Sequence, residues 1–368
     1  MQIKGVNFGG WLVLEKWIAP ELFAGTDAED EYHLARALSE EEYRTRMQRH
    51  RESFIREEDF RFLQTQGINT IRIPIPYYIF GDRKPYVGCI EHLDRAFDLA
   101  EKNGLKILID LHMVPGSQNG FDNGGICGVC KWASLPEEVE YSLQLLEKLA
   151  VRYGKREGLW GIQPLNEPIT DALTGDIPWE QVWIRSIYPP KSAEEEAGSA
   201  PIRMEFLRAF YQKAHALVTP HMGTDKVFVI HDAFRTAMWK DFMREEQYRN
   251  VVLDTHFYFG SVEAGGCPKA LEAYQAVVEQ RFYPILDEMS AYFPVITGEW
   301  SLDSGYAKEL SAREGKEKAY RAVAEIQNRA WKHTAGSFFW TYRILSDSPD
   351  ADAWSFEKAV QWLNVSHQ

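Results

Sequence analysis

Short, continuous runs of apolar residues alternate along the chain with longer stretches in which apolar residues recur every three or four positions. Uninterrupted apolar runs are typical of strands buried on both faces of a parallel sheet, and the longer spacing is typical of amphipathic helices. The pattern predicts eight strands, at Ile3–Phe8, Asn69–Pro74, Leu105–His112, Gly158–Asn166, Lys226–His231, Val251–Phe257, Pro294–Glu299 and Gly336–Trp340.

A predicted helix follows each of these strands. Gly67, Gly104 and Gly154 provide helix stop signals. The helices are predicted at Glu52–Gln66, Ile90–Asn103, Pro136–Tyr153, Ile202–Val218, Ala237–Arg244, Lys269–Ser290, Arg313–His333 and Ser355–Leu363, with a further helical stretch at Ser39–Gln48. Eight strand–helix units predict an α/β fold, a (β/α)8 TIM barrel, that takes up residues 1–368 as a single domain.

Three of the predicted connections from a strand to the next helix are long. They are Gly10–Arg51, Val114–Leu135 and Ile169–Pro201. In this kind of barrel the connections that follow the strands build the active site. Long connections there predict walls around a pocket.

Composition and charge exclude several kinds of partner. Apolar residues make up 45% of the chain, and the formal net charge is −13. This charge disfavours nucleic acid and anionic membranes as partners. No run of about 18 apolar residues predicts a membrane span. The acidic runs Asp27–Glu31 and Glu194–Glu196 are expected to be solvent-exposed.

The N-terminal residues read as a strand rather than as a secretion signal, which favours a cytoplasmic protein, or a secreted one if a leader has been removed. The four cysteines are Cys89, Cys127, Cys130 and Cys267. Cys127 and Cys130 form a CxxC motif in a glycine-rich loop. We favour reduced thiols, because the motif lacks a second metal-ligand pair and the helix start of redox motifs. A disulfide or a bound metal stays open.

Two glutamates each end a predicted strand. Glu167 lies in Leu165–Pro168 and Glu299 in Gly298–Trp300. The carboxyl ends of parallel barrel strands open to one mouth, so both carboxylates are expected in the same cleft. Two carboxyl groups in one cleft can serve as proton donor and nucleophile for breaking a glycosidic bond.

Other predicted strands also end in polar or aromatic residues. Burying such polar groups costs several kcal/mol unless they are paired, so their recurrence predicts a functional cluster. Aromatic rings can stack on the apolar faces of sugars. The cluster comprises Arg72, His112, Asn166, His256, Tyr258 and Trp340.

Together with Glu167 and Glu299, and in this order, the cluster resembles the active-site set of glycoside hydrolase family 5, of clan A. The resemblance covers essentially the whole chain. Gly5–Glu15, Glu57–Phe60 and Pro115–Asn123 are similar to the exo-β-1,3-glucanase branch of that family, known best from fungi. The resemblance implies that no cofactor or metal is needed.

The resemblance also implies roles for single residues. Glu167 would be the acid/base and Glu299 the nucleophile of a retaining reaction, which requires carboxyl groups roughly 5–5.5 Å apart. Arg72 would keep Glu299 ionised. Tyr258 would donate a hydrogen bond to Glu299, and Asn166 would hold the 2-hydroxyl of the sugar.

The remaining roles concern the binding of the sugar. His112 and His256 would bind it or orient the acid/base, and Trp340 would form the floor of the −1 subsite. Glu15 would grip the hydroxyls of the terminal glucose and close the cleft, which favours exo action.

On the leaving-group side the chain departs from that branch. Phe121 and Asp122 match residues at its entrance, but Ser261 stands where a phenylalanine is expected and Tyr342 where a tryptophan is usual. The −1 site is therefore expected to be kept and the leaving-group side to be altered. Five aromatic residues are left open between stacking on a sugar and packing in the fold: Trp179, Trp183, Tyr188, Trp300 and Trp354.

These observations predict a retaining β-glucoside hydrolase that releases glucose from β-1,3-glucan oligosaccharides or from other β-glucosides. The expected partner is such a sugar, with no nucleic acid and no membrane. Two alternatives stay open: an endo-β-1,4-glucanase of the same family, and a barrel that binds sugar without catalysis.

Overall fold

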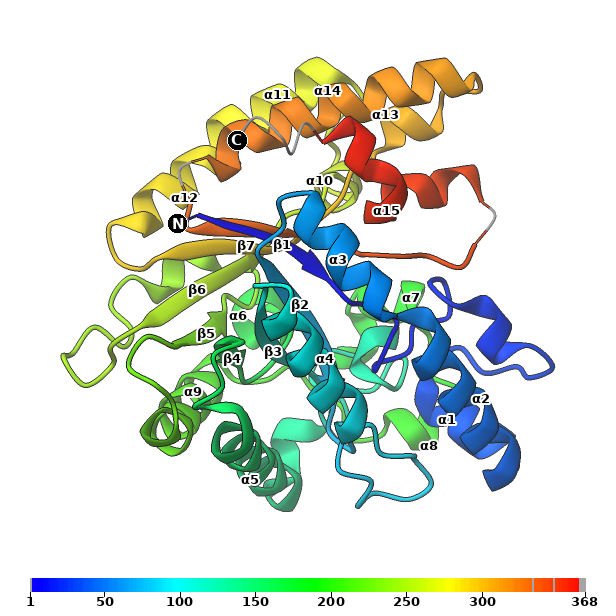
Figure 1. The fold of residues 1–368 in the computed structure, drawn as a ribbon, viewed down its shortest axis with the longest axis vertical. Helices are drawn as coiled ribbons and strands as arrows, with labels where there is room; N and C mark the ends of the chain where they lie inside the picture. The colour runs from blue at the N-terminus through cyan, green and yellow to red at the C-terminus, as the bar shows by residue number, and fades with distance from the viewer. Residues whose placement is uncertain (1, 333, 347, 364–368) are drawn as a thin grey trace.

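Eight parallel strands close into a barrel in chain order, with β1 paired to both β2 and β8 (Figure 1). This is the predicted (β/α)8 fold, seen in a computed structural model that describes residues 2–332, 334–346 and 348–363. The strands are β1 (Ile3–Asn7), β2 (Thr70–Pro76), β3 (Lys106–Met113), β4 (Leu159–Gln163), β5 (Val227–His231), β6 (Val251–His256), β7 (Val295–Trp300) and β8 (Gly336–Phe339).

Helices surround the barrel and connect successive strands (Figure 1). The longer ones are α2 (Glu40–Phe54), α3 (Glu57–Thr65), α4 (Ile90–Lys102), α5 (Pro136–Tyr153), α9 (Met204–Val218), α12 (Tyr283–Ser290) and α14 (Arg313–Trp331). The shorter ones are α1 (Glu31–Ala37), α6 (Asp171–Thr174), α7 (Ile184–Ile187), α8 (Ala193–Glu196), α10 (Phe259–Ala264), α11 (Leu271–Val277), α13 (Gly305–Lys308) and α15 (Phe356–Ala359).

The period of two along each strand builds the interior of the barrel in layers. One apolar layer consists of Leu108, Val229, Val252, Ile296 and Phe338. On β3 and β6 the same face then carries Asp110 and Asp254, and two residues later His112 and His256. The strands thus change from apolar to polar side chains towards their carboxyl ends, which places the chemistry at one mouth.

In the first long loop the predicted helix boundaries are wrong. The predicted helices were Ser39–Gln48 and Glu52–Gln66. In the structure α2 continues through Phe54, and α3 begins at Glu57 after a short break. The carboxylate of Asp59 accepts the backbone N–H of Arg56 at 2.7 Å and stabilises the new helix start. Asp59, a polar residue three positions after Arg56, was the feature of the sequence that indicates this helix start.

The predicted helix Lys269–Ser290 forms as three consecutive segments. Between α11 and α12 lies a π-helical turn, Val278–Phe282. Pro284 has no N–H to donate, so regular α-helical hydrogen bonding is interrupted next to it. Turns of this kind are rare in proteins, and those that occur are often found at functional sites.

Two other predicted helices are shorter than expected. In place of Ala237–Arg244 the structure has a 3₁₀ turn at Thr236–Trp239, and Met243 has a left-handed backbone (φ 50°) that a regular helix cannot contain. Ser355–Leu363 forms α15 and a 3₁₀ turn. The last residue of the predicted helix Arg313–His333 lies outside the described residues.

The acidic runs are not wholly exposed as predicted. Glu31 in α1 is fully buried and accepts hydrogen bonds from the Tyr43 hydroxyl at 2.7 Å and the Leu14 N–H at 3.3 Å. Glu196 is buried too, against Arg185. Internal partners, which local charge patterns do not reveal, stabilise both carboxylates.

The four cysteines are free thiols, and burial raises the pKa of Cys89 to about 11. In the part of the chain that the structure describes, no helix has the length and apolar character needed to cross a membrane.

Candidate active site

A cavity of about 620 Å³ opens at the carboxyl ends of the strands, within the usual size range of small-molecule sites. Eight predicted site residues line it: Glu15, Phe121, Asp122, Glu167, His256, Tyr258, Glu299 and Trp340. The other three, Arg72, His112 and Asn166, are fully buried and reach the lining through the contacts described below.

Arg72 on β2 joins side chains from four other strands. Its Nη1 donates to Glu299 Oε1 at 3.0 Å, and its Nη2 donates to Asn166 Oδ1 at 2.7 Å. Its further partners are Asn7, Asp110 and Gln163. These contacts compensate the burial of a guanidinium group and hold Glu299 and Asn166 in fixed relative positions.

Glu299 on β7 is held from two sides. Besides Arg72, the hydroxyl of Tyr258 donates to its Oε2 at 2.8 Å. Burial raises the pKa of Glu299 above its ordinary value, while the charges of His256 and Arg72 oppose this shift and that of Glu167 adds to it. The structure thus places Arg72 and Tyr258 on Glu299 as predicted.

Glu167 follows β4 on a tight turn. Its φ of 43° lies in the left-handed region that residues other than glycine rarely occupy. Asn123, from the long loop after β3, donates to Glu167 Oε2 at 3.1 Å. Strained backbone of this kind persists where several contacts determine it together, and it concentrates at active sites.

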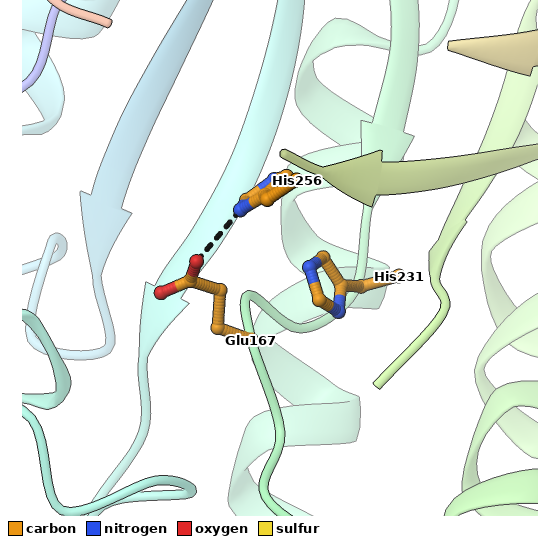
Figure 2. A group of neighbouring side chains, drawn as sticks. All are labelled: Glu167, His231 and His256. Carbon is orange, nitrogen blue, oxygen red and sulfur yellow. Dashed lines mark hydrogen bonds and ion pairs between the residues drawn. The ribbon is translucent and has the colours of Figure 1, made fainter. Parts of the chain in front are cut away.

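His256 at the end of β6 lies among three carboxylates. Its Nδ1 is 2.7 Å from Glu167 Oε1 (Figure 2) and 3.5 Å from Glu299 Oε2. Its Nε2 is 3.3 Å from Asp254 Oδ2. Burial alone would lower the pKa of His256, but the charges of Glu299 and Asp254 and its hydrogen bonds raise the pKa well above 6.5.

The Glu167–His256 contact therefore holds a proton at neutral pH. Burial would raise the pKa of Glu167, but the hydrogen bond and the charge of His256 outweigh burial and lower the pKa. In the free site the shared proton lies on His256, on the nitrogen that faces Glu167.

The spacing of the two glutamates fits a retaining reaction. Because one nitrogen, Nδ1 of His256, contacts both, Glu167 Oε1 and Glu299 Oε2 lie at most about 6 Å apart. Inverting enzymes need a wider gap, roughly 6.5–9.5 Å, to admit a water molecule between the carboxyl groups and the sugar.

His231 at the end of β5 completes a group of three potential metal ligands with Glu167 and His256 (Figure 2). His231 Nδ1 accepts the N–H of Ala233 at 3.0 Å, so its other nitrogen carries the proton. Its ring lies edge-on to His256, 4.4 Å between centroids. Since both nitrogens of His256 already face carboxylates, we interpret the group as one that handles protons.

His112 is fully buried and is not among the residues that line the cavity. Its ring is stacked on Trp340, 5.5 Å between centroids at 7°. Its Nδ1 lies 2.5 Å from Asp110 Oδ2, and its Nε2 lies 3.4 Å from Asn166 Nδ2. Through these contacts His112 supports Trp340 and Asn166.

Glu15 lies at the β1–β8 side of the cavity. Trp17 Nε1 donates to its Oε2 at 3.0 Å, while its buried Oε1 has no hydrogen-bond partner among the described residues. Burial raises the pKa of Glu15 well above its ordinary value, and the charge of Asp122 adds to this. Burial raises the pKa of Asp122 to about 6. An unpartnered carboxyl oxygen suits the gripping of sugar hydroxyls.

The five aromatic residues left open divide between the cavity lining and packing in the fold. Trp183, Tyr188 and Trp354 line the cavity. Trp179 is buried and donates to the Gly128 carbonyl, and Trp300 packs against Phe339. Trp354 also contacts Trp17 and Tyr258.

Of the two departures from the family pattern, only Ser261 lies at the cavity. Tyr342 is buried elsewhere, where its hydroxyl donates to Asp59 at 2.6 Å, so its predicted effect on the leaving-group side is wrong. Several lining residues were missed, among them Phe234, Arg235, Arg281 and Phe282. The interruption of a long helix by Pro284 was the only signal for the last two.

Comparisons with known proteins identify the family of this chain. The model of Cellulase (glycosyl hydrolase family 5) matches residues 38–342, more than half of the chain. A probable glucan 1,3-beta-glucosidase A of Emericella nidulans is 36% identical over 310 residues, which are 82% of this chain and 67% of that protein. The glucan 1,3-beta-glucosidase of Candida oleophila is 31% identical over 97% of this chain and 86% of its own length. The chain belongs to glycoside hydrolase family 5.

Solved structures share the fold. Rutinosidase from Aspergillus niger superposes with a TM-score of 0.73 at 21% identity, over 99% of this chain and 98% of its own. A family 5 enzyme from Prevotella bryantii B14 does so with a TM-score of 0.58 at 15% identity, over 98% of this chain and 94% of its own.

Proposed function

We propose that the protein is a retaining, exo-acting β-glucosidase in which Glu299 is the nucleophile and Glu167 the acid/base. The observation that carries this is the placement of both carboxylates around one imidazole, His256. Glu299 is held by the guanidinium of Arg72 and the hydroxyl of Tyr258, while Glu167 lies within hydrogen-bond distance of His256, and this difference in partners distinguishes the nucleophile from the acid/base.

In the first step a Glu299 oxygen attacks the anomeric carbon, the glycosidic C–O bond breaks, and the leaving oxygen takes the proton of Glu167. Arg72 and Tyr258 hold Glu299 in position. The proton on His256 moves to Glu167 as the substrate displaces water. In the second step water attacks the same carbon, gives a proton to Glu167 and releases Glu299.

We infer exo action from the residues that line the β1–β8 side of the cavity. Glu15, Trp17 and Trp354 line the cavity and contact one another there, and we place this wall at the end where a longer glycone would continue. The substrates we propose are β-1,3-glucan oligosaccharides and other β-glucosides, with glucose over Trp340. The names of the relatives support the glucan part.

A product assay tests this function. Laminarin, laminaribiose, gentiobiose, cellopentaose and an aryl β-glucoside are offered, with Glu299→Gln as the control. We expect glucose alone at early times, and a rate at least about a thousandfold lower in the control. A ladder of longer oligosaccharides would contradict exo action, and an active Glu299→Gln variant would contradict the assigned nucleophile.

A further inference from the structure

The cavity extends across the barrel mouth from the β1–β8 side to the β4–β6 side. Trp340 and Glu15 lie on the first side, and Glu167, the proposed proton donor, follows β4. Because the donor must face the glycosidic oxygen, the leaving group occupies the second side. This inference rests on the proposed function, since it assigns the group that leaves.

Two aromatic walls line that second side. One consists of Phe121 with Trp183 and Tyr188, whose rings lie 6.0 and 5.5 Å from it. The other includes Phe257 stacked on Phe282 at 4.2 Å and 14°. Further apolar lining residues there are Leu173, Phe234 and Val262.

Two polar side chains that line this region, Asp232 and Arg235, are already paired. Asp232 accepts from the Phe234 N–H at 2.8 Å and from the Thr236 hydroxyl at 2.5 Å. Arg235 donates to the carbonyls of Ala172 and Leu173. A sugar ring placed here would leave several hydroxyl groups without partners, which costs affinity.

Arg281 differs from these groups. It lines the cavity and is exposed, and its side chain makes no hydrogen bond or ion pair with any described residue. The π-helical turn Val278–Phe282 carries it beside Phe282. A guanidinium at the edge of an aromatic slot can stack on a flat ring.

We propose that this side of the cavity prefers, over a second sugar, a flat aromatic alcohol as the leaving group, bound between these walls and covered by Arg281. Phe257, Phe282 and Arg281 then determine specificity, and Ser261 leaves the room that the ring system needs.

The test compares substrates whose leaving groups are all alkanols, so that the intrinsic reactivity of a phenol does not dominate. These are 2-naphthylmethyl β-glucoside, laminaribiose and methyl β-glucoside. We expect kcat/KM for the naphthylmethyl compound to exceed that for laminaribiose about tenfold. In Arg281→Gln the ratio of naphthylmethyl to methyl kcat/KM should fall about threefold, mainly through KM.

Arg313→Gln is the matched control, because Arg313 is 85% exposed at the start of α14 and loses the same charge. Its substrate ratio should equal that of the wild type. If laminaribiose is the better substrate, or if Arg281→Gln leaves the ratio unchanged, the inference is wrong although the glucosidase function stands. If none of the β-glucosides is cleaved, the proposed function itself fails.

Discussion

At the scale of single residues, Gly298 controls the position of His256. A Cβ at residue 298 would lie 2.3 Å from both carboxylate oxygens of Asp254, and the Gly298 N–H donates to one of them at 2.6 Å. Asp254 in turn faces His256 Nε2. Only glycine permits this approach of β7 to Asp254, so the catalytic cluster depends on the absence of a side chain.

We therefore expect Gly298→Ala to displace Asp254, to lower kcat more than about tenfold and to cost about 1–3 kcal/mol of stability. Kinetics and denaturant unfolding measure both effects. Gly260→Ala is the control, since a Cβ there meets no atom within 4 Å. Equal behaviour of the two variants would show that the Gly298 contact does not position Asp254.

The pH dependence of activity also belongs to single residues. The pKa of His256 is raised well above 6.5, so its proton is present at neutral pH and is lost only as the pH rises through that higher value. The alkaline limb of kcat/KM should lie above pH 6.5. The acid limb should lie above 4.5, because burial raises the pKa of Glu299 and the nucleophile must be ionised.

In His256→Asn, Glu167 titrates without its partner, and we expect the alkaline limb to move to lower pH. Tyr258→Phe, which removes a hydrogen bond to Glu299 but no proton of this pair, should leave the limb in place. An unmoved limb in His256→Asn would refute the shared proton.

At the scale of elements, Asp30 and His33 connect α1 to two of the long loops. Asp30 accepts the His33 N–H at 2.9 Å as the helix cap and the Cys127 N–H at 2.8 Å. His33 Nδ1 lies 2.7 Å from Asp30, and its Nε2 lies 3.1 Å from Glu195. The helix therefore connects the loops that follow β3 and β4, which carry Asn123 and the aromatic wall.

This connection should depend on pH. Burial lowers the pKa of His33, but Asp30 and Glu195 outweigh burial and raise the pKa above 6.5. The resulting stability is fully present below about 6.5 and is lost as the pH rises through the raised pKa. The melting temperature lost in His33→Gln should thus be larger near about pH 6 than near about pH 9. His221→Gln, on the surface, is the control, and a loss that grows with pH would contradict the argument.

At the scale of the whole molecule, Arg72 links the barrel together. Its partners come from β1, β3, β4 and β7, and its side chain is fully buried. The same guanidinium orients Glu299, so stability and catalysis depend on one group. Without this positive charge, the buried carboxylates around Arg72 would repel one another.

Arg72→Met should therefore cost about 3–5 kcal/mol, the usual effect of removing one member of a buried ion pair, and should abolish hydrolysis. Urea denaturation followed by circular dichroism measures the first effect. Arg72→Lys keeps the charge but not the forked geometry, so we expect a smaller loss of stability with a large loss of kcat. An unchanged urea midpoint in Arg72→Met would disprove the linking role.

Much of the site could be predicted because it lies on regular elements. His112 and His256 belong to strands whose inward face repeats every second residue, so their convergence follows once a parallel barrel is assumed. Glu299 lies three residues beyond the inward-facing Ile296, and the register shift between β6 and β7 brings it to the mouth. Where a residue lies between elements, as Tyr342 does, neighbouring sequence does not reveal which way it faces. Its contact with Asp59 joins positions far apart in the chain.

The sequence by itself determined the eight-stranded barrel and predicted that Glu167 and Glu299 share one mouth, because the strands follow from local periodicity and the shared mouth from the common direction of parallel strands. Only the tertiary structure decided which polar residues are buried with partners, as Glu31 is, and which side chains form the leaving-group slot. The burial of these polar residues and the shape of the slot depend on contacts between loops and on the interrupted helix that carries Arg281 and Phe282. The energies of such contacts are set by residues that are distant in the chain.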